Sequence, residues 1–151
     1  MRVELNGQVT IAAPIERAYQ VLTTPEGLLK TMPGLKSLTP DGDRRYQAVM
    51  EIGVAAIRGR YTGIMEVSEE SAPTHYRLKM SGQGPGAFVS IDLVIDLEDQ
   101  GDGSTLLRHT GTAQVGGTMA GVGQRVMGGV SAMILGQFFQ AVGREAQAEG
   151  A

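Results

Sequence analysis

The sequence predicts an α+β fold in which about six to seven antiparallel strands pack against one long C-terminal helix. From Lys36 to Gly116, apolar and polar residues alternate in segments separated by turn-forming sequences, a pattern typical of hairpin-connected strands. After Thr118 the apolar residues recur every three or four positions, which predicts a helix with one apolar stripe. Two short helices are expected after the first strand.

The N-terminal segment predicts that first strand and the two short helices. Val3–Ile11 shows an imperfect alternation of polar and apolar residues, so we expect a strand there. Pro14 suits the first turn of a helix, and Glu16 lies near the positive end of its dipole. A second helix is expected to begin at Pro25 and to end at Pro33-Gly34.

Alternating segments supply the rest of the sheet. The sequences between them, at 40–43, 69–74 and 98–104, are rich in residues that favour turns. If Ala55-Ala56 forms a two-residue hairpin loop, Glu51 lies opposite Arg60, a pair worth about 0.2–1 kcal/mol; a bulge is the alternative. The predicted strands are Arg45–Val54, Ile57–Val67, His75–Ser81, Ala87–Glu98 and Thr105–Gly116.

The glycine-rich stretch from Val115 to Val130 does not match a nucleotide-binding loop. Gly121 and Gly123 begin a dinucleotide fingerprint, but Val126 occupies the position of its third glycine. A P-loop requires lysine after its last glycine, and the stretch contains none. We expect Gly116-Gly117 to end the last strand instead.

The long C-terminal helix has two interpretations. Val126–Gly143 carries no charge and approaches the length of a membrane span, although Arg125 and Arg144 bracket it. Without this helix the strands would lose the cover of their apolar face, so we favour a core helix held by the sheet. Glycines seven residues apart along it (Gly129, Gly136, Gly143) allow close approach of the sheet, a ligand or a partner.

Composition narrows the function. The chain has 151 residues, so we expect one domain over residues 1–148 and a short tail at 149–151. A net charge of −3 argues against nucleic acid as a partner, and the absence of cysteine excludes disulfides and cysteine-ligated zinc. No signal peptide or separate membrane anchor is recognised, so a cytoplasmic protein is expected.

The two histidines do not predict a metal or catalytic site. We expect His75 to be solvated at the start of its strand. His109 is expected to point inward, where a hydrogen-bonded core histidine is favoured over a polar contact to a ligand. The methionines are more informative because thioethers adapt to irregular apolar ligands. Composition alone favours an ordinary core in which methionine fills gaps.

Three segments carry a resemblance to a known family: "APIERAYQVLTTPEGLLKTMPGLKSL", "RYQAVMEIGVAAIRGRYTGIMEV" and "AQVGGTMAGVGQRVMGGVSAMILGQFFQAV". Over nearly its whole length the chain resembles the CoxG family of carbon monoxide dehydrogenase proteins, which belongs to the START-like, helix-grip superfamily. The resemblance implies a curved antiparallel sheet around the C-terminal helix, enclosing an apolar cavity. It also implies association with molybdenum hydroxylases of the carbon monoxide dehydrogenase type, in maturation, membrane recruitment or quinone handling.

With this resemblance the inward methionines and glycines predict a ligand cavity. The expected lining residues are Met50, Tyr61, Met65, Leu78, Met80, Ile91, His109, Ala113, Met119, Met127, Val130 and Met133. The expected mouth residues are Met32, Gly121, Gly128 and Gly129. No metal ligands, catalytic residues or covalently bound cofactor are expected.

The expected function is non-enzymatic binding of a quinone-like or lipid ligand, in the recruitment, maturation or electron-acceptor coupling of a molybdenum hydroxylase. Because the chain ends directly after the helix, any membrane contact, at the inner face of the cell membrane, is expected to be peripheral or mediated by a partner. Two alternatives remain. One is a cavity-based enzyme like the START-like cyclases and hydratases, and the other is a purely structural adaptor of the hydroxylase.

Overall fold

A computed structural model of the chain describes residues 1–54 and 57–150, with only the backbone described for 149–150. Its first half contains the strands β1 (Arg2–Glu4), β2 (Gly7–Ile11), β3 (Leu35–Pro40) and β4 (Arg45–Ile52) and the helices α1 (Ile15–Thr23) and α2 (Pro25–Thr31). Its second half contains β5 (Gly59–Ser71), β6 (His75–Gly84), β7 (Ala87–Asp99), β8 (Thr105–Gly117), η2 (Thr118–Val122) and α3 (Gln124–Gly150).

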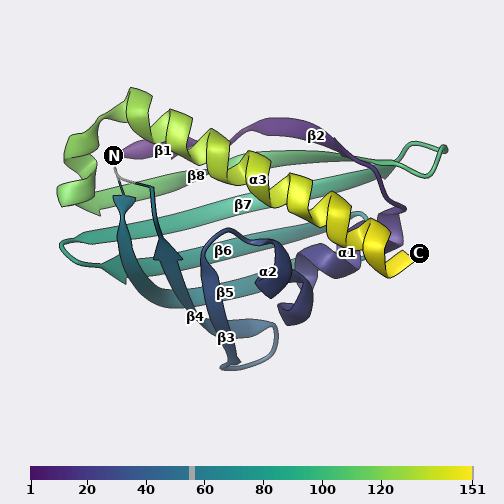
Figure 1. Cartoon of the computed structure of the whole chain (residues 1–151), viewed down its shortest axis with the longest axis horizontal. Helices are drawn as coiled ribbons and strands as arrows, with labels where there is room; N and C mark the ends of the chain where they lie inside the picture. Colours follow the sequence, from purple (N-terminus) through teal and green to yellow (C-terminus); the bar gives the residue numbers. More distant parts are fainter. Residues whose placement is uncertain (55–56, 151) are drawn as a thin grey trace.

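The strands form one antiparallel sheet in the order β1-β8-β7-β6-β5-β4-β3, and β2 also pairs with β8. The sheet curves around α3, which crosses its concave face, while α1 and α2 close the lower end (Figure 1). The predicted α+β fold, with a long C-terminal helix and two short helices, is confirmed.

The N-terminal segment differs from the prediction because it forms two strands, β1 and β2, instead of one. The interruption falls at Leu5 and Asn6. The ring Nδ1 of His109 donates a hydrogen bond of 2.7 Å to the Leu5 carbonyl, and the Asn6 side chain accepts one of 3.1 Å from the Gly111 amide. These side chains replace backbone partners in the ladder, so regular pairing stops and then resumes at Gly7 opposite His109.

The β4–β5 hairpin has the predicted register. Glu51 pairs with Arg60, and a side-chain oxygen of Glu51 lies 3.4 Å from the Arg60 guanidinium. The loop residues 55–56, on which the turn prediction falls, lie outside the described part of the chain.

The C-terminal helix begins later than the periodicity predicts. Gly117, with φ +73°, ends β8 as expected, but a 3-10 turn follows and Gly123, with φ +99°, separates it from α3. L side chains rarely adopt these angles, which explains glycine at both positions. The helix then continues to Gly150, so most of the segment assigned to a tail is helical.

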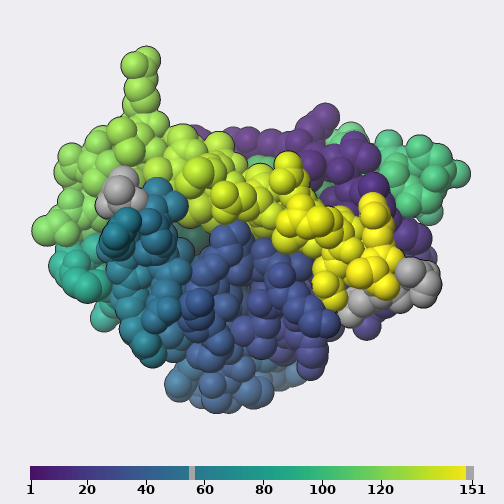
Figure 2. Space-filling model, viewed as in Figure 1, coloured from purple at the N-terminus to yellow at the C-terminus, as the bar shows by residue number. Residues whose placement is uncertain are grey.

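α3 is long and apolar enough to cross a membrane, but the core helix of a globular domain passes the same test. Here it packs against α1, α2 and the edge strands β1 and β2. Val142 and Ala146, in its C-terminal half, are fully buried with Leu22 and Leu28 of the short helices. Only 22% of its most apolar window is buried, however. Its outer face therefore forms a ridge of the molecular surface, yellow-green to yellow in Figure 2.

Candidate functional site: an apolar cavity under α3

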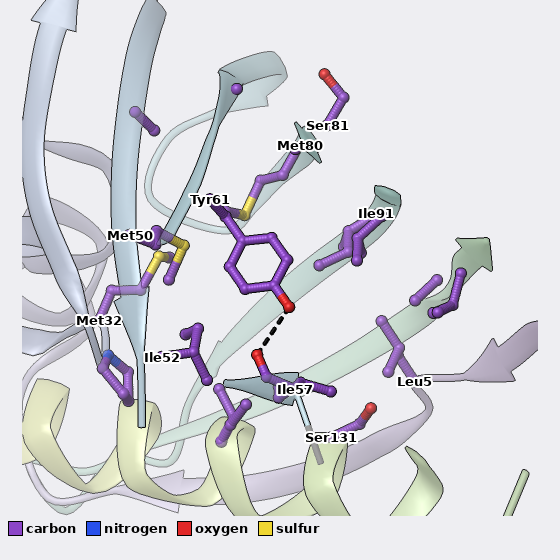
Figure 3. A pocket seen from close by; sticks show the side chains of 18 of the residues that line it. Leu5, Met32, Met50, Ile52, Ile57, Tyr61, Met80, Ser81, Ile91 and Ser131 are labelled. Carbon is purple, nitrogen blue, oxygen red and sulfur yellow. Dashed lines mark hydrogen bonds between the residues drawn. The ribbon is translucent and has the colours of Figure 1, made fainter. Parts of the chain in front are cut away.

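A cavity of about 210 Å³ lies between the concave face of the sheet and the N-terminal half of α3. Its walls come from β4, β5, β6, β7 and β8, from η2 and α3, and from the segment after α2. Figure 2 shows the surface hollowed between the β4–β5 hairpin, the α2–β3 segment and α3. Met32, Ile52 and Ile57 line the cavity from these segments (Figure 3).

The cavity exists because a row of small residues crosses the sheet. Ala48 pairs with Gly63 in the β4–β5 ladder, and Gly63 pairs with Gly82 in the β5–β6 ladder. The adjacent rows carry large side chains on the same face, including Met80 and Tyr61. Side chains of neighbouring rows therefore form the walls, while the missing side chains in the row of Ala48, Gly63 and Gly82 leave the space between them.

The walls are apolar and adaptable. Five methionines on different elements line the cavity, and no Asp, Glu, Lys, Arg or His occurs among its described lining residues. Thioethers adjust to ligands of irregular shape at little cost. An ionised ligand group would lose its hydration here without gaining an ion pair, so the cavity favours an uncharged ligand. The methionines are Met32, Met50, Met80, Met119 and Met127.

Two hydroxyl groups interrupt this apolar lining. Tyr61, on β5, donates a hydrogen bond of 2.7 Å from its hydroxyl to the Ile57 carbonyl (Figure 3). Burial raises the pKa of Tyr61 above its ordinary value, so the phenol stays protonated and remains a donor. Ser131, on α3, lines the cavity from the other side and makes no side-chain hydrogen bond to the described residues.

Most of the residues expected to line a cavity do lie on its walls. This agreement follows from the strand alternation and from the helix period. They are Met50, Tyr61, Leu78, Met80, Ile91, Ala113, Met119, Met127 and Val130, together with Met32 from the expected mouth.

Met65 and Met133 do not line the cavity. Met65 has no exposed surface and packs in the filled core. Met133 is 42% exposed on the outer face of α3, because Val130 and Ile134 take the inward positions of that turn.

The expected mouth glycines also lie outside the cavity wall. A side-chain carbon added at Gly121, Gly128 or Gly129 would have no neighbour within 4 Å, so these positions face open space. The opening is bordered instead by residues that carry side chains on the β4–β5 hairpin and after α2. Periodicity places a residue on a face of an element but does not say which part of that face a neighbouring element covers.

His109 is buried, as predicted, but lies behind the cavity wall. Its ring donates to Leu5, and it packs against Phe139 with ring centroids 5.3 Å apart. Its other edge is close to Gly7, where an added side-chain carbon would lie 3.0 Å from Nε2. The hydrogen-bonded core histidine, favoured from the sequence, is therefore the observed arrangement. With both ring edges occupied, His109 has no access to a ligand in the cavity.

Structural ion pairs account for the other charged side chains near the sheet. His75 lies 2.7 Å from Asp96, and Arg77 donates to Asp92 at 2.7 and 2.5 Å. The Arg77 hydrogen bonds lower the pKa of Asp92. Among the described residues, no group of three His, Asp or Glu side chains is arranged to hold a metal ion.

A polar cluster at the other end of the sheet was not predicted. Arg44 donates two hydrogen bonds of 2.7 Å to Glu70, which also accepts one from the Tyr19 hydroxyl. Tyr19 meets Tyr76 edge to face, with centroids 5.7 Å apart. The Tyr76 hydroxyl is buried without a hydrogen-bond partner. These residues lie far apart in the sequence, so no local pattern brings them together, and none of them lines the cavity.

Comparisons with known proteins agree with this architecture. The model of the carbon monoxide dehydrogenase subunit family CoxG matches residues 7–147. A conserved protein from Geobacillus kaustophilus has a similar crystal structure, with 36% identity, a TM-score of 0.92, and coverage of 98% of this chain and 96% of that chain. None of the curated proteins compared with the sequence matches it significantly.

More distant solved structures share the fold alone. The ZhuI aromatase/cyclase from Streptomyces sp. R1128 has 15% identity and a TM-score of 0.72, covering 100% of this chain and 97% of that one. A START superfamily protein from Mycobacterium smegmatis has 14% identity and a TM-score of 0.74, covering 96% and 97%.

Proposed function

The chain belongs to the CoxG family of carbon monoxide dehydrogenase proteins, and from this premise we propose that it binds an uncharged, quinone-like molecule for a molybdenum hydroxylase of that type. The observation that carries the proposal is the charge-free cavity lined by methionines under α3. The protein then acts without catalysing a reaction, by carrying or presenting the ligand to the enzyme or by assisting its recruitment or maturation.

The size of the cavity supports a ligand with a compact ring. An enclosed apolar cavity of roughly 150 Å³ accepts a benzene molecule, and this one measures about 210 Å³. One or two fused rings fit such a volume, whereas a long isoprenoid chain does not. A quinone therefore binds by its ring, and its tail leaves through the opening beside Ile52 and Ile57.

The chemistry of the walls supports a carrier over an enzyme. Acid–base catalysis needs titratable groups within hydrogen-bond reach of the reacting atoms. The described lining residues offer hydroxyl groups but no carboxylate, imidazole or amine. The fold shared with an aromatase/cyclase brings no catalytic residue to this chain, because an identity of 15% supports the fold alone.

The outer face of α3 supports contact with a membrane, where a lipophilic quinone resides. Val126 and Met133 are 46% and 42% exposed, and Gly129 and Gly136 lie between and beside them on the same exposed face. The sequence from Thr105 to Arg144 contains basic residues but no acidic one. An apolar patch flanked by arginine suits the surface of an anionic membrane. We therefore propose a peripheral location at the inner face of the cell membrane.

Native mass spectrometry of gently purified protein tests the proposal. We expect bound mass corresponding to a quinone, or saturable uptake of menaquinone and ubiquinone analogues with short tails. 2-Naphthoate, which combines a similar ring with a carboxylate, is the matched control and should bind at least tenfold more weakly. A clean apo mass with no uptake of either analogue contradicts ligand binding. Co-purification with hydroxylase subunits under those same conditions would favour the structural adaptor.

A further inference from the structure

Tyr61 is held in one orientation on the cavity wall. Its ring lies over Gly84, where an added side-chain carbon would come within 2.7 Å of a ring carbon. Its hydroxyl reaches across to the Ile57 carbonyl, four residues earlier in the chain. A phenol fixed at both its ring and its hydroxyl presents a hydrogen-bond donor in a defined direction at little cost in entropy.

Ser131 presents a second hydroxyl from the opposite side. Its neighbours on the inward face of α3, Met127, Val130, Ile134 and Leu135, are all apolar. Figure 3 shows Ser131 on the helix and Tyr61 on the sheet, with the cavity between the two elements. A hydroxyl without a partner in apolar surroundings is unfavourable, and a ligand acceptor would remove that cost.

We propose that the Tyr61 and Ser131 hydroxyls recognise a ring carrying two hydrogen-bond acceptors, one toward β5 and one toward α3. This inference rests on the proposed function, because it concerns the same cavity, and it adds which chemical groups select the ligand. A ring with carbonyl oxygens on opposite edges fulfils both contacts. A hydrocarbon of the same size fills the cavity but leaves both hydroxyls as they are in the free protein.

Binding of such a ligand also affects the β4–β5 hairpin. The Tyr61 hydroxyl has one proton, so it donates either to Ile57 or to the ligand. When it donates to the ligand, the Ile57 carbonyl loses its partner near the opening, where water replaces it. The hairpin then keeps only its own contacts, such as the hydrogen bond of 3.0 Å from the Ile57 amide to the Val54 carbonyl. Occupancy of the cavity thus loosens a segment at its entrance.

Two substitutions and two probes test the inference. Tyr61→Phe and Ser131→Ala each remove one hydroxyl and keep the apolar volume of the side chain. The probes are 1,4-naphthoquinone and naphthalene, measured by titration calorimetry. A lost neutral hydrogen bond lowers affinity about 3- to 10-fold. We expect that loss for naphthoquinone in each variant, and unchanged or tighter binding of naphthalene.

Hydrogen exchange gives an independent readout. We expect the Ile57 amide to exchange faster in Tyr61→Phe without ligand, and in the wild-type protein when naphthoquinone is bound. Naphthalene should leave its exchange unchanged. The melting temperature of each variant verifies that it folds, and Ser131→Ala keeps the affinity test valid if Tyr61→Phe is unstable.

The outcomes separate this inference from the function on which it rests. Wild-type affinity for naphthoquinone in both variants, with the wild-type protein binding both probes, overturns the inference and leaves the cavity as a carrier site without polar selection. Failure of the wild-type protein to bind either probe overturns both. Equal loss of naphthalene and naphthoquinone affinity also overturns the inference, since it means that the substitutions damage the cavity.

Discussion

Gly63 and Gly82 face each other across the β5–β6 ladder, and their missing side chains open the cavity. The two glycines differ in what surrounds them. A side-chain carbon at Gly63 would lie 1.7 Å from the Ser81 carbonyl oxygen, a severe clash with backbone. At Gly82 the nearest atom would be the Thr62 carbonyl oxygen at 3.8 Å, an ordinary contact. The first glycine permits the strands to approach, whereas the second only leaves space.

Gly82→Leu is therefore expected to fill the cavity without unfolding the protein. The leucine side chain takes the inward position between Met80 and Gly84 and occupies the volume that a ligand ring needs. Ligand affinity should fall more than tenfold. The melting temperature should stay the same or rise, because glycine within a strand is unfavourable. Calorimetric titration and thermal unfolding measure the two effects.

Gly63→Ala is the matched comparison on the neighbouring strand. Relief of its clash requires β5 and β6 to separate locally, so we expect a loss of at least about 2 kcal/mol in the free energy of unfolding. If Gly82→Leu binds a ligand as the wild-type protein does, the cavity is not the binding site.

His109→Phe is expected to reduce stability and to leave ligand affinity within about twofold of the wild-type value. Phenylalanine keeps the contact with Phe139 but removes the hydrogen bond to the Leu5 carbonyl. Loss of a partner for a buried carbonyl costs about 1–3 kcal/mol. Urea unfolding and ligand titration measure the two quantities. A catalytic role for His109 would instead appear as lost turnover in a variant of near-normal stability.

Glu70 is expected to make stability depend on acid. Its hydrogen bonds from Arg44 lower the pKa of Glu70 below the ordinary value of 4.5. A carboxylate with a lowered folded-state pKa stabilises the protein above its unfolded-state pKa, and that contribution disappears as the pH falls through the folded-state pKa. Glu70→Gln should lower the free energy of unfolding by about 1.5–3 kcal/mol at pH 7, and by less near pH 3.

Glu66→Gln is the control for this measurement. Glu66 also pairs with an arginine, but at 3.8 Å and with 39% of its side chain exposed, so its loss should cost less than about 1 kcal/mol. Equal effects of the two substitutions at pH 7, measured by urea unfolding, would contradict a special role for Glu70.

Strand alternation was sufficient to predict the sheet and one of its registers. Glu51 opposes Arg60 because a period of two and a short connection leave few alternatives. The break between β1 and β2 was not predictable in this way. It depends on His109, 104 positions from Leu5, taking a carbonyl that the ladder would otherwise use. No local pattern in Val3–Ile11 contains that information.

The cavity was predictable as a face but not as a volume. Alternation assigns Met65 and Met80 to the same inward face, yet Met65 is fully buried in the filled core whereas Met80 lines the cavity. The difference depends on which part of the sheet α1 and α2 cover. The helix period has the same limitation, since it did not distinguish inward Val130 from exposed Met133 without the crossing direction of α3.

Gly136→Ala should stabilise the protein by about 0.5–1 kcal/mol and leave ligand affinity unchanged. Glycine inside a helix is unfavourable relative to alanine by this amount, and an added methyl group at Gly136 meets no atom within 4 Å. Gly129→Ala has the same open surroundings and should behave alike. Urea unfolding and ligand titration measure both. A loss of affinity in either variant would restore the glycines to the mouth of the cavity.

Met133→Asp is expected to weaken binding to anionic membranes by about tenfold, because it removes apolar contact and adds a negative charge at the centre of the exposed patch. Co-flotation with phosphatidylglycerol vesicles measures the bound fraction. Gln140→Asp introduces the same negative charge on the exposed face of α3 but outside the segment of Val126 and Met133, so it should retain most of the binding. Equal loss in both variants would mean that charge alone governs binding, and no loss in either would place the membrane contact on another surface.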